Sequence, residues 1–191
     1  RNDEYLLLSA NYSQIELRIL AELCEDAKLL KTFLEGGDVH TDTATRIYGI
    51  EKSGVTDEIR RQAKAVNFGI IYGVSASALS KRLDISRALA SDLIKQYFAQ
   101  YPGVRSYIDR TLEFTREHGY IETVTGRRRY IKDINSRNAT IRCQAERIAM
   151  NAPIQGSAAD LIKIAMGAIH VKLLEKEYRS RMLLQSYDEL V

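Results

Sequence analysis

Helical spacing of apolar residues runs through most of this chain, whereas segments with the character of strands are few and do not follow one another. A doubly wound parallel sheet requires strands that alternate regularly with helices, and this pattern does not provide them. We therefore expect an α+β fold that is mostly helical and carries a small antiparallel sheet. No apolar run approaches the length of about 18 residues that a membrane-spanning helix requires, so we expect no association with a membrane.

Three ranges have the character of strands, and they are residues 5–10, 119–124 and 182–187. The first is a short apolar run that suits a buried strand. The second alternates in polarity and is followed by Thr125-Gly126, which predicts a hairpin. After the third range, Asp188-Glu189 is expected to form a turn into a further strand.

Apolar positions at intervals of three and four residues predict helices over most of the remaining chain. Thr56 is expected to cap one of them, because a threonine side chain accepts hydrogen bonds from the free N–H groups of a first helical turn. Pro102 is expected to separate two helices and Pro153 to interrupt another, since proline has no N–H for the helical ladder. The expected helices cover residues 13–30, 41–48, 57–72, 75–83, 86–100, 103–118, 138–151 and 154–178.

The composition is that of a globular protein, since 45% of the 191 residues are hydrophobic and 28% are charged. These proportions exclude an intrinsically disordered chain and a collagen-like repeat. The net charge of +3 is too small to indicate a nucleic acid as the partner, so the positions of the charges have to decide. Cys24 and Cys143 lie far apart and are expected to be free thiols.

The two ends of the chain carry further expectations. The first residues lack the basic start and apolar stretch of a signal peptide, which predicts a cytoplasmic protein. The last residues, Leu190-Val191, stand within an expected strand, which predicts that the sequence is part of a longer chain.

Arg60, Lys64, Phe68 and Tyr72 follow one another at intervals of four residues. Four residues advance a helix by about 400°, so this spacing places two cations and two aromatic rings along one side of the helix. One interpretation is a solvated helix whose aromatic residues turn inward. The other is a strip that binds a triphosphate through Arg60 and Lys64 and stacks a base near the aromatic rings. The spacing alone leaves both open.

Acidic and amide side chains stand at the ends of the first and last expected strands. Asp188 and Glu189 are expected at the tip of a hairpin, where carboxylates are also common simply because they suit turns. The comparable position after the first strand is Asn11, whose side chain is a neutral amide. A site for two Mg²⁺ ions prefers carboxylates, because Mg²⁺ is a hard cation that binds charged oxygen ligands.

A basic stretch extends over residues 127–147, with seven basic residues against the two acidic residues Asp133 and Glu146. Such a cluster suits contact with a phosphate backbone, although the same residues would also suit ion pairs with acids elsewhere in the fold. Asn151 and Gln155 flank Pro153, and their amides suit base or sugar edges as well as the capping of a helix break. The basic residues are Arg127, Arg128, Arg129, Lys132, Arg137, Arg142 and Arg147.

Taken together, these motifs resemble those of the family A DNA polymerases, and the resemblance covers essentially the whole chain. The family's first palm motif is similar to SANYSQIELRILAEL, its fingers helix to RRQAKAVNFGIIYG and its last catalytic motif to LLQSYDELV. Its template-handling stretches are similar to TGRRRYIKDI and ERIAMNAPIQGSAADLIK. The resemblance implies a partial right-hand polymerase fold, with helical fingers on a small palm sheet. It assigns residues 1–36 to the palm, 37–118 to the fingers with a nucleotide-binding helix at 57–72, and 119–191 to the return into the palm.

The resemblance also implies a role for each matching residue. Arg60 and Lys64 would hold the phosphates of an incoming deoxynucleoside triphosphate, with Lys64 as a proton donor to the leaving pyrophosphate. Glu16 would exclude a 2′-hydroxyl by a steric clash. The metal site would consist of Asp188, Asn11 and the carbonyl of Tyr12, with Glu189 in support. The other nucleotide-binding residues would be Phe68, Tyr72, His40 and Gln14, and the DNA-binding residues would be Arg127, Arg128, Arg147, Asn151 and Gln155.

Two positions depart from the family pattern. Asn11 stands where the family carries a metal-bridging aspartate, and Tyr187 stands where it usually has a histidine. A neutral amide cannot bridge two cations as a carboxylate does. We therefore expect weakened Mg²⁺ binding and an inactive or impaired chain.

The function that the resemblance implies is template-directed DNA synthesis in replication and repair. A monomer would act on primer-template DNA and deoxynucleoside triphosphates with two Mg²⁺ ions. Three alternatives stay open, which are a non-catalytic DNA-binding remnant, a single-subunit RNA polymerase and a helical interaction domain. Glu16 as a sugar gate, and Phe68 in place of a tyrosine, argue against the RNA polymerase.

Overall fold

The computed structural model describes residues 5–191, which form an α+β fold dominated by helices, as the sequence predicts. The helices are α1 (Ile15–Cys24), α2 (Ala27–Leu34), α3 (Val39–Tyr48), the 3₁₀ helix η1 (Lys52–Gly54), α4 (Asp57–Ile71), α5 (Ala76–Leu83), α6 (Arg87–Gln100), α7 (Pro102–His118) and α8 (Ala139–Glu175). The strands are β1 (Ala10–Asn11), β2 (Tyr120–Glu122), β3 (Arg128–Tyr130), β4 (Gln185–Ser186) and β5 (Glu189–Leu190).

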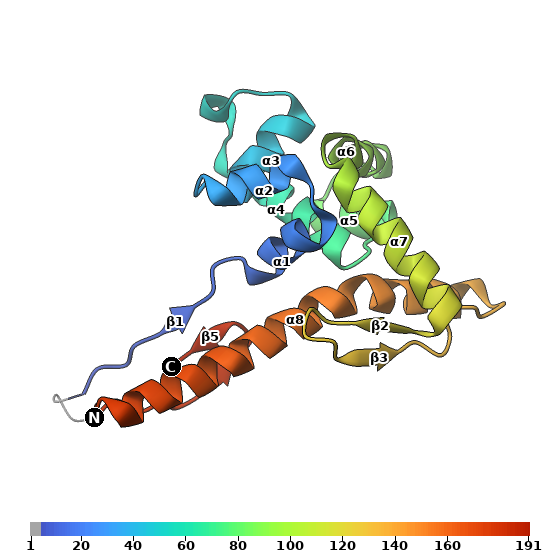
Figure 1. Ribbon diagram of the computed structural model, residues 1–191. Helices are drawn as coiled ribbons and strands as arrows, with labels where there is room; N and C mark the ends of the chain where they lie inside the picture. Colours follow the sequence, from blue (N-terminus) through green and yellow to red (C-terminus); the bar gives the residue numbers. More distant parts are fainter. Residues whose placement is uncertain (1–4) are drawn as a thin grey trace.

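The helices α1 to α6 gather at one end of the molecule, and α8 runs along its base (Figure 1). α7 leads from this cluster down to the start of α8. The β2–β3 hairpin lies beside the first part of α8, whereas β1 and β5 lie beside its last part. The long helix therefore connects two small sheets that lie far apart.

Both sheets are antiparallel. The first has the strand order β1-β5-β4 and joins the two ends of the chain, with Ala10 opposite Leu190 and Asn11 opposite Glu189. The second is the β2–β3 hairpin, in which Ile121 is opposite Arg129.

One large hydrophobic core fills the space between the upper helices and the middle of α8. Leu17 on α1, Val66 on α4, Tyr97 on α6 and Ile154 on α8 are almost completely buried in it. The apolar faces that predicted these helices are therefore the faces that pack. A second, smaller core lies between the hairpin and the first part of α8 and contains Ile121, Ile131, Ile134, Ala145, Ala149 and Ala152. Within residues 5–191, no helix is long and apolar enough to cross a membrane.

The predicted start of the chain is wrong in two respects. Residues 5–9 are not a buried strand, since Leu6, Leu7 and Leu8 are exposed and only Ala10 and Asn11 pair with β5. The single helix expected at residues 13–30 is interrupted, because Glu25 has the left-handed φ of 50°. The side chain of Asp26 then accepts hydrogen bonds from the N–H groups of Lys28 and Leu29 and begins a new helix, α2.

The predicted interruption at Pro153 is also wrong, because α8 continues through it. Proline in a helix interior removes one hydrogen bond and crowds the preceding turn. Pro153 is buried, so packing compensates for this loss, and the hydroxyl of Ser157 donates to the Pro153 carbonyl oxygen at 2.6 Å. Tertiary packing here overrides the local preference of proline.

The last strands differ in detail from the prediction. Of residues 182–187, only Gln185 and Ser186 form a strand. The turn consists of Tyr187, at a φ of 52°, and Asp188, so that Glu189 already belongs to β5. Asp188 alone therefore occupies the hairpin tip where the sequence analysis expected an acidic pair.

Candidate functional site

The helix α4 carries the predicted strip of cations and aromatic rings. Its first turn is capped by Thr56, whose hydroxyl accepts a hydrogen bond from the Ile59 N–H at 3.3 Å, as predicted. Lys64 is exposed and Phe68 is half-buried. The rings of Phe68 and Tyr72 stack with their centroids 6.5 Å apart, which gives the aromatic part of the strip a continuous surface.

Arg60 is held by Asp38, the residue that caps α3. The guanidinium donates to the two carboxylate oxygens of Asp38, from Nε at 2.6 Å and from Nη2 at 3.1 Å. Burial raises the pKa of Asp38, but the hydrogen bonds from Arg60 and Thr41 outweigh it and bring the pKa well below its ordinary value. A two-pronged guanidinium of this kind matches phosphate oxygens as well as carboxylate oxygens.

His40 lies beside Phe68 on the same side of α4. The two ring centroids are 5.8 Å apart, and His40 is almost completely buried. Burial lowers the pKa of His40 to about 4, and the charges of Arg60 and Lys64 act in the same direction against the opposing charge of Asp38. The imidazole is therefore neutral at neutral pH.

Tyr72 connects α4 to α1. Its hydroxyl donates to Oε2 of Glu16 at 2.8 Å. Burial, followed by the hydrogen bond and charge of Glu16, raises the pKa of Tyr72 to about 12, while a hydrogen bond to Gln155 opposes the shift. Residues from α1, α4 and α8 thus meet at one phenol.

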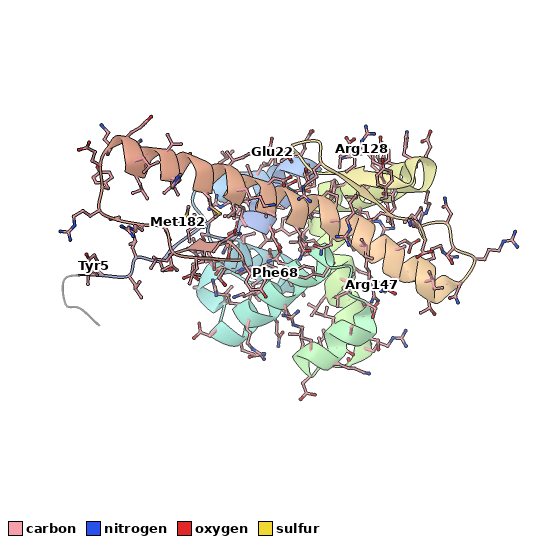
Figure 2. The ribbon with its side chains drawn as sticks, turned by 90° about the horizontal axis from the view of Figure 1, so that it is seen from below. Tyr5, Glu22, Phe68, Arg128, Arg147 and Met182 are labelled. Atoms are coloured by element: carbon pink, nitrogen blue, oxygen red, sulfur yellow. The ribbon has the colours of Figure 1, made fainter. Side chains whose placement is uncertain are left out.

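The first half of α8 lies against the end of α4. Gly73 follows Tyr72 with a φ of 60°, and a Cβ added there would collide with Met150 and with the side chain of Arg147. Arg147 is exposed, and Asn151 carries a buried Oδ1 without a hydrogen-bond partner within residues 5–191. Figure 2 shows Phe68 and Arg147 along one side of α8, with Arg128 along the other.

The two ends of the chain meet at the first sheet. The backbone N–H of Tyr12 donates to the carbonyl oxygen of Asp188 at 3.1 Å, and Asn11 is the partner of Glu189 in the sheet register. The side chain of Glu189 accepts a hydrogen bond from the hydroxyl of Ser9. The backbone at Asn11 therefore lies close to the hairpin tip that carries Asp188, whereas their sharing of a metal ion stays a prediction.

This sheet is tied to the α4 strip by a short piece of chain. Asn11 precedes Glu16, the partner of Tyr72, by five residues, which span at most about 18 Å. Gln14 lies between them and takes a left-handed φ of 57° before α1 begins.

The oxygen atoms at the first sheet have the chemistry of a divalent-cation site. They are the carboxylate of Asp188, the amide oxygen of Asn11 and the carbonyl of Tyr12, and Mg²⁺ prefers oxygen ligands. Residues 5–191 contain no group of three or more histidine, cysteine or acidic side chains that could hold a metal. The carboxylate of Asp188 and the amide of Asn11 together carry less charge than a carboxylate pair would give.

Some basic residues of the stretch 127–147 form ion pairs with acidic side chains, and others do not. Arg127 donates from Nε to Asp160 on α8 at 2.9 Å, and Arg128 donates from Nε to Glu122 at 2.7 Å. Two of the three predicted DNA-binding arginines, Arg127 and Arg128, therefore have carboxylate partners. Within residues 5–191, those with no ion pair are Arg129, Lys132, Arg137, Arg142 and Arg147.

Sequence reasoning missed two residues of this site, Asp38 and Asn67. Asp38 was detectable as a helix cap two positions before His40. Asn67 is completely buried, and its Nδ2 lies 3.1 Å from Nδ1 of His40. In the sequence, Asn67 could have been noticed as an amide on the apolar face of an amphipathic helix, beside Ala63, Val66 and Ile70.

Comparison with known proteins gives consistent results. The family model described as DNA polymerase family A matches residues 1–191. The DNA polymerase I of Geobacillus stearothermophilus is 50% identical over 188 residues, which are 98% of this chain and 22% of that protein. The DNA polymerase I of Streptococcus pneumoniae strain R6 is 51% identical over 190 residues, which are 99% of this chain and 22% of that protein.

A solved structure has the same fold. It is the POL domain of Pol1 from M. smegmatis in complex with a DNA primer-template and a dNTP, and it matches with a TM-score of 0.91 and 46% identity. The match covers 95% of this chain and 32% of that one. The present chain thus has part of a right-hand polymerase fold and spans about a fifth of the length of the two curated relatives, 22% of each.

Proposed function

This chain belongs to DNA polymerase family A, and from that membership we propose that it forms the nucleotide-binding and metal-binding part of a template-directed DNA polymerase. The reaction is the attack of a primer 3′-oxygen on the α-phosphate of a deoxynucleoside triphosphate, with release of pyrophosphate. Residues 1–36 and 119–191 belong to the palm, and residues 37–118 form the fingers. The observation that carries the proposal is the strip on α4, where two cations and two aromatic rings lie beside a neutral histidine donor.

The nucleotide is bound from α4 and its neighbours. Arg60 and Lys64 hold the phosphates, and Lys64 donates a proton to the leaving pyrophosphate. Phe68 stacks beside the sugar and base, and Tyr72 packs at the template-base position. Because Tyr72 holds Glu16 by a hydrogen bond, the carboxylate is placed to exclude a 2′-hydroxyl.

The hard cation site is at the first sheet. Asp188, the Tyr12 carbonyl and Asn11 would hold Mg²⁺, with Glu189 beside them. Bound there, Mg²⁺ stabilises the negative charge that develops on the attacking and leaving oxygens. Asn11 supplies an oxygen but no charge, so this chain holds the cation more weakly than one with aspartate at that position.

Primer and template lie along α8. Arg147 contacts a backbone phosphate, and the amides of Asn151 and Gln155 contact the nascent base pair. The buried and unpartnered Oδ1 of Asn151 supports this placement, because a buried acceptor without a donor is unfavourable unless a ligand supplies one. Arg127 and Arg128 add positive charge near the duplex although each also has a carboxylate partner.

A chimera tests this function directly. Residues 1–191 would replace the matching segment of the Geobacillus stearothermophilus relative, and Asn11→Asp would be introduced into the same chimera. We expect Mg²⁺-dependent primer extension by the Asn11→Asp chimera and a strong preference for deoxynucleotides over ribonucleotides. A folded Asn11→Asp chimera that extends no primer would exclude polymerase activity, and equal use of ribonucleotides would favour an RNA polymerase.

A second function, DNA binding without catalysis, is favoured by Asn11 itself. The affinity of residues 1–191 for primer-template DNA can be measured at several salt concentrations. A protein that contacts several phosphates releases counterions and loses affinity steeply as salt rises. A steep dependence in a chain that stays inactive after Asn11→Asp supports this second function, and a salt-independent response supports a helical interaction domain.

A further inference from the structure

A buried chain of hydrogen bonds runs from the start of α7 to His40. The hydroxyls of Tyr101 and Thr43 are 3.2 Å apart, and the Thr43 hydroxyl donates to Oδ1 of Asn67 at 3.2 Å. The amide Nδ2 of Asn67 in turn lies 3.1 Å from Nδ1 of His40. All four side chains are almost completely buried, so the hydrogen bonds that link them are shielded from water.

The Asn67 amide determines the direction of the hydrogen bond at His40. Its Oδ1 accepts from the Thr43 hydroxyl at 3.2 Å, and its Nδ2 lies 3.1 Å both from the Thr43 hydroxyl oxygen and from Nδ1 of His40. An amide nitrogen can only donate, and Nδ1 of His40 therefore has to accept. A neutral imidazole that accepts at Nδ1 carries its hydrogen at Nε2.

Nε2 lies on the edge of the imidazole away from the Asn67 contact at Nδ1. Within residues 5–191, Nε2 of His40 makes no hydrogen bond, although Phe68 packs beside the ring. The charged groups that act on the ring are Asp38 at the start of α3 and Arg60 and Lys64 on α4. Burial, with the charges of Arg60 and Lys64, outweighs the opposing charge of Asp38 and lowers the pKa of His40 to about 4, so the imidazole is neutral at neutral pH.

We infer that Asn67 is a positioning residue that holds His40 in the tautomer with hydrogen on Nε2, so that the histidine meets the nucleotide phosphates as a neutral donor. The inference rests on the proposed function, since it assigns the phosphates as the acceptor. Arg60 and Lys64 supply the positive charge of the site, and His40 adds a directed hydrogen bond. An asparagine at this position thus acts on the substrate through a second residue.

The tautomer can be read directly in the 191-residue chain. Histidine labelled with ¹⁵N gives signals for three residues only, and the His40→Gln variant identifies those of His40. We expect Nδ1 of His40 to be unprotonated and Nε2 to be protonated across the neutral range. If Nδ1 of His40 carries the hydrogen in the unmodified chain, the inference is wrong, and no variant of Asn67 is needed to show this.

Asn67→Asp reverses the direction of the hydrogen bond between residue 67 and Nδ1 of His40. A carboxylate only accepts, so it draws the hydrogen to Nδ1 and raises the pKa of His40. A matched control is Asn135→Asp, at an exposed asparagine whose amide donates to the Arg116 carbonyl. Unchanged His40 signals in Asn67→Asp would contradict the inference.

A second variant covers the case in which Asn67→Asp does not fold. Thr43→Val removes both the donor to Asn67 Oδ1 and an acceptor of Asn67 Nδ2, and it leaves the amide free to turn. We expect a mixture of His40 tautomers in this variant. A spectrum identical to that of the unmodified chain would show that the network does not fix the imidazole.

Kinetics in the Asn11→Asp chimera test the link to the nucleotide. At pH 8.5, Asn67→Asp presents the lone pair of Nε2 to the phosphates, and we expect KM for the nucleotide to rise about tenfold with a smaller change in kcat. At pH 6 the ring is protonated in this variant, so the increase should shrink. An unchanged KM at both pH values would contradict the role of His40 in nucleotide binding. A chimera without any activity would contradict the proposed function, and the ¹⁵N spectra alone would then decide the tautomer of His40.

Discussion

The backbone N–H of Tyr12 donates to the carbonyl oxygen of Asp188 at 3.1 Å, although the two residues stand near opposite ends of the chain. The bond fixes the tip of the β4–β5 hairpin beside the end of β1. Any cation held by Asp188 therefore lies next to residue 11, whose side chain decides how much charge the site contains.

Asn11→Asp should increase primer extension by the chimera about a hundredfold to several-thousandfold. The added carboxylate supplies a few kcal/mol of charge stabilisation in the transition state, and about 1.4 kcal/mol corresponds to a factor of ten in rate. Single-turnover rates at saturating Mg²⁺ measure the effect. Asn11→Ala is the matched control and should stay slow, because it changes the side chain without adding charge. Equal rates for the aspartate and alanine variants would contradict the metal assignment.

Phe68→Tyr should relax discrimination against dideoxynucleotides in the Asn11→Asp chimera. Phe68 has no phenolic oxygen, and a tyrosine there offers a polar atom that can replace the missing 3′-hydroxyl near the phosphates. We expect the preference for the deoxynucleotide to fall by about tenfold or more, the effect of one hydrogen bond in a closed site. The ratio of kcat/KM for the two nucleotides measures it. Tyr72→Phe serves as the control, and a similar change in both variants would argue against a specific role for Phe68.

The sequence predicted the α4 strip well because all of its signals are local. Thr56 caps the helix, apolar residues recur at helical spacing, and the intervals of four residues determine which side chains share a face. The hairpin tip at Asp188 was predicted for the same reason, since a turn depends on a few neighbouring residues. These features do not require knowledge of what packs against them.

Features that depend on distant partners were not predictable in the same way. Pro153 stays within α8 because it is buried and because the Ser157 hydroxyl donates to its carbonyl oxygen, and nothing near it in the sequence indicates the burial. Arg127 was assigned to DNA, but its carboxylate partner Asp160 stands 33 residues later in the sequence, on α8, and becomes its neighbour only in the folded chain. Such pairings follow from tertiary packing, which a single sequence does not reveal.

Asp38→Asn should destabilise the chain by about 1 kcal/mol or less at pH 7. Asparagine still caps α3, so the loss is that of the ion pair with Arg60, whose side chain is 43% exposed and screened by solvent. The folded-state pKa of Asp38 lies below its ordinary value of 3.8, so this stability is present above that pH and disappears as the pH falls below it. Urea unfolding at pH 7 and pH 3 measures the difference. Asp109→Asn, in the exposed pair with Arg105, should have a smaller effect.

Asp160→Asn should loosen the β2–β3 hairpin and destabilise it by about 1 to 3 kcal/mol. The carboxylate accepts hydrogen bonds from Thr125 at 2.6 Å, from Thr123 at 2.8 Å and from Arg127 at 2.9 Å, which lower the pKa of Asp160 to about 2. An amide provides only one acceptor oxygen for these donors. Hydrogen exchange of the hairpin amides should become faster, while the amides of α4 are unaffected. Glu122→Gln, which removes the exposed partner of Arg128, is the control and should change exchange less.

His40 should make the chain less stable as the pH falls from about 6.5 to about 4. The pKa of the imidazole is lowered from 6.5 to about 4 in the folded chain, so over this range the unfolded chain binds a proton that the folded chain does not. The stability is therefore fully present above the unfolded value, and about 2 to 3 kcal/mol is lost by pH 4 at about 1.4 kcal/mol per pH unit. The effects of Asp38 and Asp160 develop from about pH 5 downward, as their unfolded carboxyls begin to bind protons, so the range between pH 6.5 and about pH 5 is the one that reports on His40. Urea unfolding at intervals of half a pH unit should show this slope in the unmodified chain and lose it in His40→Gln, whereas His118→Gln, at an exposed histidine, should retain it. The same slope in His40→Gln would mean that another group titrates in this range and that the imidazole is not the buried neutral donor we infer.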